Sequence, residues 1–299
     1  MSGFVKVHVK ALHDQGQELM PLLQPHISRA AETIKNYMVT LIVNEEPLGS
    51  GTFVKTCGVE GILTAYHVAE KLFQFSEFSL CVADFPHRLD IIPPGIVEHI
   101  PIGAVSKTSS ADEGPDLSFL IIKDAGLLEK LRTLKSFYLL DSVRLPSLHP
   151  CLNPRIWGIA GTNSDSFKRI KENHNGAPLS KMTNFVGTGF FSCESFEKEF
   201  FDYVKLEVTA GKDRFPDNYR GMSGGGFWLI PLEANAISKG DTNADLNTIG
   251  HRPPILAGVE FFQSERENGN RILTGHGPHS VYLRLREVLN SLPRKSNIP

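Results

Sequence analysis

The sequence predicts an all-β fold built in two halves, and three observations support this prediction. Short runs rich in Val, Ile, Phe, Leu and Thr recur from residue 37 almost to the end of the chain. Gly, Pro, Asn and Asp separate these runs, which is the pattern of strands joined by turns. Helical segments do not alternate with the runs, which argues against a parallel α/β sheet. A barrel or sandwich in two halves, divided at about residues 125–150, fits this order of elements.

The expected elements can be followed in order along the chain. Residues 17–35 have helical character and are expected as two helical pieces, because Pro21 and Pro25 interrupt them. Residues 279–292 have apolar side chains at helical spacing and predict a closing helix. Surface loops are predicted at residues 161–181 and 231–254. Strands are predicted at residues 37–43, 51–55, 61–65, 78–83, 95–100 and 117–122 in the first half, and at 155–160, 185–192, 203–208, 225–230 and 255–262 in the second.

Composition excludes several classes of protein. The 299 residues contain 41% hydrophobic and 21% charged residues, which is ordinary for a globular protein with a sizeable core. A net charge of −2 offers no basic surface for nucleic acid or for an anionic membrane. No apolar run reaches the length of a membrane span, and the N-terminal residues lack the apolar stretch of a secretory signal peptide. We therefore expect a cytoplasmic protein.

The cysteine and histidine patterns do not predict a metal site. The pair His276 and His279 is separated by Gly and Pro, which favours a loop over a metal-binding helix face. We expect no metal and no organic cofactor. The four cysteines are widely spaced without a CxxC motif, so reduced thiols are expected for Cys57, Cys81, Cys151 and Cys193.

A single serine stands among glycines in the stretch "NYRGMSGGGFWL". Ser223 has Gly221 two residues before it and residues 224–226, all glycine, directly after it. Glycine permits unusual backbone dihedrals and lets another molecule approach closely. One interpretation is a tight turn before a buried strand. The other is a nucleophile whose neighbouring N–H groups face a substrate.

A histidine and an aspartate stand at two other strand ends. His67 in "GILTAYHVAE" follows a strand and begins a short helix, and Asp116 in "GPDLSFLII" begins a buried strand. An imidazole can accept the proton of a serine hydroxyl, and a carboxylate on the far ring nitrogen fixes its tautomer. Taken singly, each residue also has a structural interpretation, as a half-buried histidine or a polar turn residue. Together with Ser223 they favour a catalytic triad.

Three motifs carry a resemblance to a known family. "LTAYHV", "PDLSFL" and "GMSGGG" resemble the His, Asp and Ser motifs of the chymotrypsin-like (trypsin-like) serine proteases, in that family's order and at similar spacings. "GSGTFVK" resembles the strand before the histidine in single-chain bacterial members of the HtrA type. "ILAGVEFF" resembles the strand that lines the substrate cleft. The resemblance covers residues 37–292.

The resemblance implies a role for each motif residue and a fold. Ser223 would be the nucleophile, His67 the general base and acid, and Asp116 the carboxylate that orients the imidazole. The backbone N–H groups of Gly221 and Ser223 would form the oxyanion hole. The implied fold is two antiparallel six-stranded β-barrels with the triad between them. The expected domains are an N-terminal helical extension (1–36), a first barrel with His67 and Asp116 (37–130), and a second barrel with Ser223 and a C-terminal helix (131–299).

The resemblance also suggests where a substrate would bind. Asp217 lies six residues before Ser223, where the trypsin subgroup has an aspartate at the base of the pocket for an Arg or Lys side chain at P1. The alternative is a loop aspartate paired with Arg214 or Arg220. The remaining substrate-binding candidates are on the cleft-lining strand, where two aromatic rings favour apolar contacts: Glu260, Phe261 and Phe262.

The chain departs from the family pattern at three positions. Met222 stands where trypsin-type zymogens have the aspartate that pairs with a freed N-terminus, so that route of activation is excluded. Val68 replaces a disulfide cysteine of secreted trypsins, and Gly226 replaces a common proline. No segment is long enough for a PDZ domain.

Two other functions fit parts of the sequence. "GMSGG" also matches G-x-S-x-G, the nucleophile elbow of α/β-hydrolases, which needs its acid and histidine after the serine. "GFWLI" predicts a strand there, however, and not the helix that an elbow requires. A protease-like binding module with an idle cleft is the other alternative. The residues available to a hydrolase are Asp241, Asp245, His251, His276 and His279.

The function that we predict is a serine endopeptidase that cleaves protein or peptide substrates through an acyl-enzyme. No nucleic-acid or membrane partner is expected. The zymogen switch is missing, so a regulatory protein partner is expected to control the enzyme through residues 1–36 or 231–254.

Overall fold

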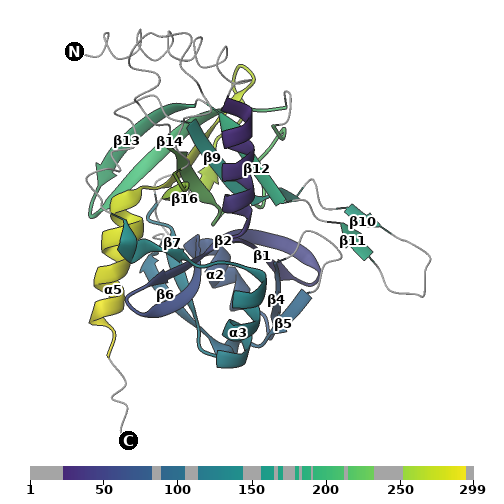
Figure 1. Ribbon diagram of the computed structural model, residues 1–299, viewed down its shortest axis with the longest axis vertical. Coiled ribbons are helices and arrows are strands. Elements are labelled where there is room, and N and C mark those ends of the chain that lie inside the picture. Colours follow the sequence, from purple (N-terminus) through teal and green to yellow (C-terminus); the bar gives the residue numbers. More distant parts are fainter. Residues whose placement is uncertain are drawn as a thin grey trace, which may run out of the picture.

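Two β-sheets that follow one another along the chain form the core of the protein in a computed structural model (Figure 1). The first sheet is built before residue 140 and the second after residue 155. The sequence prediction of an all-β fold in two halves is confirmed at this level. The structure describes residues 23–82, 89–104, 114–143, 156–164, 168–170, 179–181, 184–189, 191–211, 215–231 and 252–293.

The first sheet has eight strands. Seven run in the order β5-β4-β1-β2-β3-β7-β6 with antiparallel pairing, and the short β8 joins β2 in parallel. Every residue of β1 is buried, as the run MVTLIV predicts for a strand covered on both faces. The bounds are β1 (Met38–Val43), β2 (Glu46–Thr56), β3 (Val59–Thr64), β4 (Phe78–Cys81), β5 (Leu89–Ile92), β6 (Val97–Gly103), β7 (Leu117–Ile122) and β8 (Tyr138–Leu139).

The second sheet has seven antiparallel strands in the order β12-β9-β15-β16-β17-β14-β13. The strand GFWLI after the serine is buried at every position. A separate hairpin, β10–β11, extends to the side (Figure 1). The bounds are β9 (Ile156–Thr162), β10 (Lys168–Ile170), β11 (Leu179–Lys181), β12 (Asn184–Gly189), β13 (Ser192–Lys198), β14 (Phe201–Thr209), β15 (Gly226–Ile230), β16 (Ile255–Gln263) and β17 (Asn270–His276).

Strand counts and boundaries differ from the expectation in several places. The sheets have eight and seven strands where six each were expected, and among the described strands no pairing joins the two ends of either sheet. β8 lies beyond the expected boundary at residue 130, so the first half extends further. The sequence did not predict six strands, of which most are short and β13 has exposed polar residues: β5, β8, β10, β11, β13 and β17.

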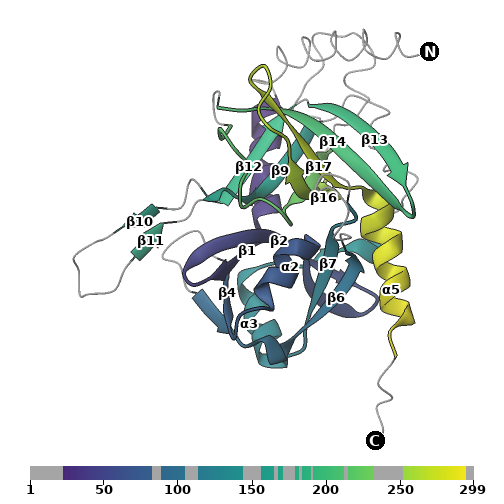
Figure 2. The same ribbon diagram turned by 180° about the vertical axis from the view of Figure 1, so that it is seen from behind.

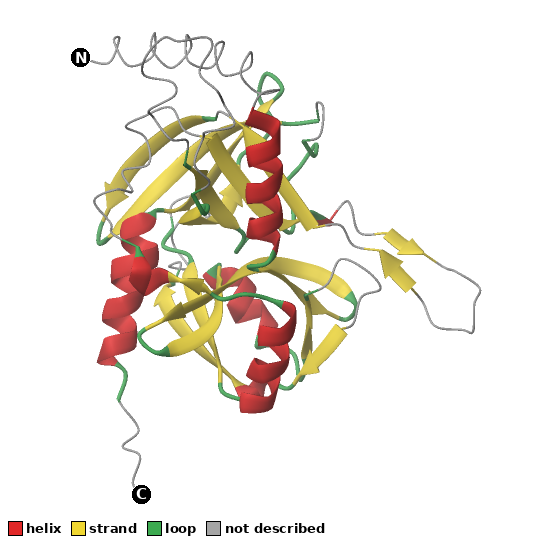
Figure 3. Cartoon of the chain, viewed as in Figure 1, coloured by secondary structure: helices red, strands yellow, loops and turns green. Residues whose placement is uncertain are grey.

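Helices lie against both sheets (Figure 3). Residues 23–35 form one continuous helix, so the predicted break at Pro25 is wrong, because proline is tolerated in a first turn; Pro21 lies outside the described residues. α2 (Tyr66–Leu72) is the short helix that was expected after the strand preceding His67. The helix α3 (Ala125–Leu134) was not predicted, although Asp124 caps it by accepting from the Leu127 N–H.

The C-terminal helix connects the halves. Its first turns, His279–Arg284, have π-helical hydrogen bonding and lead into α5 (Leu285–Ser291), as predicted for residues 279–292. Asp202 caps it by accepting from the N–H groups of His279 and Ser280. The helix leaves the second sheet and packs beside the first (Figures 1 and 2). There the Tyr282 hydroxyl donates to the Leu256 carbonyl and lies 3.5 Å from the Tyr138 hydroxyl.

Two further expectations concern cysteines and membranes. Cys57 and Cys81 are in no disulfide, but Cys193 is disulfide-bonded, so the prediction of reduced thiols is wrong for Cys193. Cys151 and most of the predicted loop 231–254 lie outside the described residues. Among the described residues, no helix has the length and apolar character that a membrane span requires.

Candidate active site

His67 and Asp116 are in direct contact where strands β3 and β7 of the first sheet end side by side. His67 is the second residue of α2, which begins directly after β3, and Asp116 immediately precedes β7, the neighbour of β3. His67 Nδ1 lies 2.5 Å from Asp116 Oδ2, and the His67 backbone N–H donates to Asp116 Oδ1 at 2.8 Å. The imidazole side chain is 46% exposed and the carboxylate 4%. Asp116 therefore holds both the ring and the backbone of His67.

Ser223 lies in a tight turn of the second sheet, immediately before β15. The Met222 N–H donates to the Tyr219 carbonyl, and the Gly225 N–H donates to the Met222 carbonyl. Gly221 and Gly224 have φ of 87° and 89°, a region that costs residues with a Cβ substantial energy. The glycines flanking the serine are therefore required by the turn itself.

Ser50, in strand β2 of the first sheet, is hydrogen-bonded to this turn. The Ser50 N–H donates to the Ser223 carbonyl at 2.8 Å, and Ser50 Oγ donates to the Gly221 carbonyl at 2.8 Å. A Cβ on Gly49 would lie 2.7 Å from the methyl groups of Val68, the neighbour of His67, and 3.0 Å from the Ser223 carbonyl oxygen. The serine turn and the start of α2 therefore meet at Gly49.

The Ser223 hydroxyl does not complete a hydrogen-bonded triad. It donates to the Phe261 carbonyl at 3.4 Å, and no hydrogen bond to His67 occurs among the described residues. Nucleophile–base hydrogen bonds are often long or poorly aligned without substrate. The structure thus brings His67 and Asp116 into contact and positions Ser223 at the same junction.

The backbone N–H groups of Gly221 and Ser223 are the predicted oxyanion hole. The Arg220 carbonyl accepts from the Ser164 N–H at 2.8 Å, and the Met222 carbonyl accepts from the Gly225 N–H at 2.7 Å. In a trans peptide the C=O and N–H point in opposite directions, so the N–H groups that follow these carbonyls point away from those partners. Among the described residues, neither N–H donates a hydrogen bond. The N–H groups of Gly221 and Ser223 could therefore both donate to a substrate oxygen.

Two buried titratable groups flank Asp116 from the second sheet. His276 is fully buried in β17, and its Nε2 accepts from the Asp116 backbone N–H at 2.8 Å. Burial lowers the pKa of His276 to about 4, against the opposing effect of Asp116 and Asp202. Glu260 in β16 is 2% exposed, and burial, with a smaller contribution from Asp116, raises its pKa to about 8. Both groups are therefore neutral at pH 7.

The predicted substrate-binding residues have different environments. Asp217 is 68% exposed and forms an ion pair with Arg266, so it is not the desolvated carboxylate expected at the base of a pocket. The alternative of a loop aspartate fits better, although with a different arginine than those considered; Arg214 lies outside the described residues. On β16, Glu260 and Phe261 are buried, and Phe262 is partly exposed.

Sequence reasoning missed two residues that position the site. The sequence motif "GSGTFVK" that contains Ser50 predicts only a strand. His276 is a candidate from sequence only as a metal ligand or as the histidine of a hydrolase. Among the described residues, no group of His, Cys, Asp and Glu side chains is arranged to hold a metal ion. A serine inside an apolar strand and a histidine ending another strand were the available signals.

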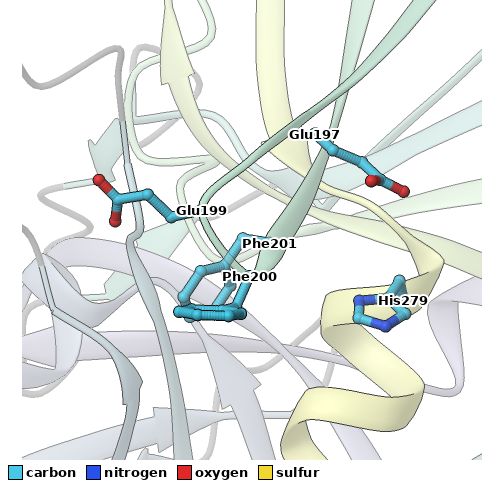
Figure 4. Close-up of a pocket in the computed structure, with 5 residues that line it drawn as sticks. All are labelled: Glu197, Glu199, Phe200, Phe201 and His279. Carbon is cyan, nitrogen blue, oxygen red and sulfur yellow. The ribbon is translucent and has the colours of Figure 1, made fainter.

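A surface hollow of about 280 Å³ lies at the turn between β13 and β14 (Figure 4). Glu197 and His279 stand on one side of the two phenyl rings that line it, and Glu199 stands on the other. One of these rings, Phe201, also contacts the His276 ring at a centroid distance of 5.4 Å. The hollow itself contains none of the predicted catalytic groups.

Comparisons with known proteins do not assign a family. No protein-family model and no curated protein matches the chain. Among solved structures 167 chains match. One of them comes from work on aromatic interactions in the coupled folding and binding of the intrinsically disordered Sesbania mosaic virus VPg protein. The two chains are 13% identical, the match spans 84% of the present chain and 90% of the solved chain, and the TM-score is 0.39. This similarity carries no argument about function.

Proposed function

We propose that the protein is a serine endopeptidase with a chymotrypsin-like arrangement of two β-barrels. The observation that carries the proposal is the contact between His67 and Asp116, in which one carboxylate accepts from the backbone of the histidine and binds Nδ1 of its ring. This arrangement leaves Nε2 as the ring nitrogen that can accept a proton. Ser223 comes from the other sheet to the same junction, as a triad between two barrels requires.

The reaction proceeds by acyl transfer. His67 Nε2 accepts the Ser223 hydroxyl proton while Ser223 Oγ bonds to the carbonyl carbon of the peptide. The same proton then passes to the leaving amine as the C–N bond breaks, which leaves an ester on Ser223. A water molecule, deprotonated by His67, attacks that ester and returns the hydroxyl to Ser223. No metal or organic cofactor is required.

The turn around Ser223 stabilises the charged intermediate. The N–H groups of Gly221 and Ser223 have no acceptor among the described residues and donate to the oxyanion that forms on the substrate carbonyl. The proposal includes no preference for Arg or Lys at P1, because Asp217 is exposed and paired with Arg266.

A second candidate is a protease-like binding module with an idle cleft. The observation in its favour is that Ser223 Oγ donates to the Phe261 carbonyl and not to His67. The same observation fits a protease that a partner activates, as we expected for residues 1–36 or 231–254. The cytoplasmic location stays a prediction, and the disulfide at Cys193 does not support a reducing compartment.

Labelling with a fluorophosphonate tests the proposal. The wild-type protein should form a covalent adduct at Ser223, identified by mass spectrometry, and Ser223→Ala should remain unlabelled. A Ser142→Ala variant, which changes an exposed serine whose hydroxyl donates to the Leu139 carbonyl, should react like the wild type. An unreactive wild type, also after mixing with extract from the source cells, would favour the binding module.

Peptide-bond cleavage needs a second measurement, because esterases also react with fluorophosphonates. New protein N-termini should appear in a proteome incubated with the wild type and not with Ser223→Ala. Their P1 residues would define the specificity. Labelling without any new N-termini would overturn the endopeptidase assignment.

A further inference from the structure

His276 is a buried histidine that the proposed mechanism does not use. It ends strand β17, is fully buried, and belongs to the second sheet, whereas Asp116 belongs to the first. Its Nε2 lies 2.8 Å from the Asp116 backbone nitrogen. This hydrogen bond therefore joins the two sheets directly behind the carboxylate that holds His67.

The polarity of this hydrogen bond determines the tautomer of His276. A backbone N–H can only donate, so Nε2 must be the unprotonated nitrogen with a free lone pair. The ring is then neutral with its proton on Nδ1, for which no acceptor exists among the described residues. A buried N–H without a partner costs free energy, so the surroundings of Nδ1 do not favour this tautomer. The hydrogen bond at Nε2 is therefore what fixes it.

Three aromatic rings restrict the orientation of the imidazole. Phe201, Tyr203 and Phe261 lie with ring centroids 5.4, 5.1 and 5.1 Å from that of His276. Phe261 also provides the carbonyl that accepts from Ser223 Oγ. These three rings restrict the direction of the Nε2 lone pair, and one of them, Phe201, also lines the surface hollow.

We propose that His276 is a positioning residue of the active site, which fixes the backbone at Asp116 so that its carboxylate meets His67. This inference rests on the proposed function. The Asp116 N–H lies just before β7, where it pairs with no neighbouring strand among the described residues. The acceptor from the other sheet, His276 Nε2, therefore fixes the orientation of the peptide group at residue 116. Docking of the second sheet thereby orients the histidine–aspartate pair of the first.

The test compares two substitutions of His276. Gln at this position retains a side-chain oxygen that can accept from the Asp116 N–H, whereas Leu retains the volume and removes the acceptor. The rate of fluorophosphonate labelling should fall about 100-fold in His276→Leu, as expected for an angstrom-scale misplacement. His276→Gln should remain within about tenfold of the wild type.

A spectroscopic readout separates positioning from mere stability. The proton between His67 Nδ1 and Asp116 gives a low-field ¹H resonance that reports this hydrogen bond directly. It should persist in His276→Gln and disappear in His276→Leu. As a matched control, His99→Leu removes another imidazole of the first sheet, whose Nε2 is bonded to Ser118 Oγ, and it should retain the resonance and the rate. A folded His276→Leu variant that retains both would overturn the proposal.

The wild-type protein provides a test that requires no substitution, in case His276→Leu does not fold. Histidine ¹H–¹⁵N correlation spectra should show His276 with its proton on Nδ1 and an unprotonated Nε2; a proton on Nε2 would contradict the inference. The two proposals can fail separately. If Ser223 does not label but the tautomer and the resonance behave as described, the endopeptidase proposal fails and the positioning role stands.

Discussion

Two of the hydrogen-bonded bridges between the sheets hold the proposed reactive segments, and they differ in chemistry. The Ser50 bridge, defined as the bonds from Ser50 to Gly221 and Ser223, fixes the serine turn to the first sheet. The His276 bridge, defined as the bond from the Asp116 N–H to His276, fixes the aspartate to the second sheet. Each reactive segment is thus held by the sheet to which it does not belong. The Ser50 bridge consists of groups that do not titrate, whereas the His276 bridge depends on a neutral imidazole.

The largest effect on labelling is expected for Asp116→Asn, which removes the charge of the residue that the His276 bridge holds. Asp116→Asn retains the backbone N–H that His276 accepts, so both bridges should survive and the fold should be unchanged. The amide cannot stabilise an imidazolium and favours the wrong tautomer of His67, so the labelling rate should fall by about 10⁴-fold. Labelling kinetics together with thermal unfolding measure this. If Asp116→Asn lowered the free energy of unfolding by as much as it raised the activation free energy of labelling, Asp116 would have a structural role instead.

A substitution at Gly224 should break the Ser50 bridge from the opposite side. Gly224 has φ of 89°, and a Cβ there would overlap the Ser50 carbonyl oxygen and the Thr64 hydroxyl. We expect Gly224→Ala to lower the free energy of unfolding by about 3 kcal/mol or more and to slow labelling, by a smaller factor than Asp116→Asn. Gly58→Ala is the matched control, because Gly58 has φ of 77° with no atom within 4 Å of an added Cβ. It should cost about 1 kcal/mol and leave labelling intact. Equal effects in urea denaturation would show that steric overlap is unimportant.

Removal of the Ser50 hydroxyl should have an intermediate effect. Its oxygen donates to the Gly221 carbonyl and accepts from the Thr162 N–H, both at 2.8 Å. Ser50→Ala leaves these two groups without that partner, at a cost of about 1–3 kcal/mol. The labelling rate should fall as well, because the Gly221 N–H belongs to the proposed oxyanion hole. A labelling rate like that of the wild type would show that the turn keeps its geometry without the bridge.

The smallest effect on labelling is expected at Glu260, where the change is in stability and depends on pH. Its pKa is about 8 in the folded protein against an ordinary value of 4.5. The folded state therefore binds more protons between these values, and this contribution to stability is lost as pH rises toward and through 8. Glu260→Gln should abolish that loss, so its unfolding midpoint should exceed that of the wild type increasingly from pH 5 to pH 8.

The His276 bridge gives the opposite dependence, which separates it from Glu260 in the same titration. The pKa of His276 is about 4 when folded and 6.5 ordinarily, so the unfolded state binds more protons in this range. Stability contributed by the neutral ring is then lost as pH falls from 6.5 toward 4. Denaturation of wild type and Glu260→Gln at both ends of the range checks the two signs. A Glu260→Gln variant whose stability does not fall from pH 6.5 to pH 5 would contradict the burial of a neutral His276, and a wild type that loses no stability from pH 6.5 to pH 8 would contradict the raised pKa of Glu260.

Local patterns predicted most of the strands that are buried along their length. Runs such as 37–43 and 117–122 are apolar at all but one position each, so their identity depends little on neighbours. The exposed strand β13 has few apolar positions and exists because β14 pairs with it along its whole length. Likewise α3 begins at an Asp124 cap that resembles any polar turn residue. These elements depend on partners that a single sequence does not identify.

The sequence by itself determined the all-β class, the order of the two sheets and the three motif residues, because residue type and spacing carry that information. Only the tertiary structure decided which groups support them. It brought Ser50 to the serine turn and His276 to Asp116 across 160 residues of sequence, and it left Asp217 exposed beside Arg266. Hydrogen bonds between distant segments depend on how two sheets dock. That docking arises from burial of a shared core, to which each segment contributes only a small part.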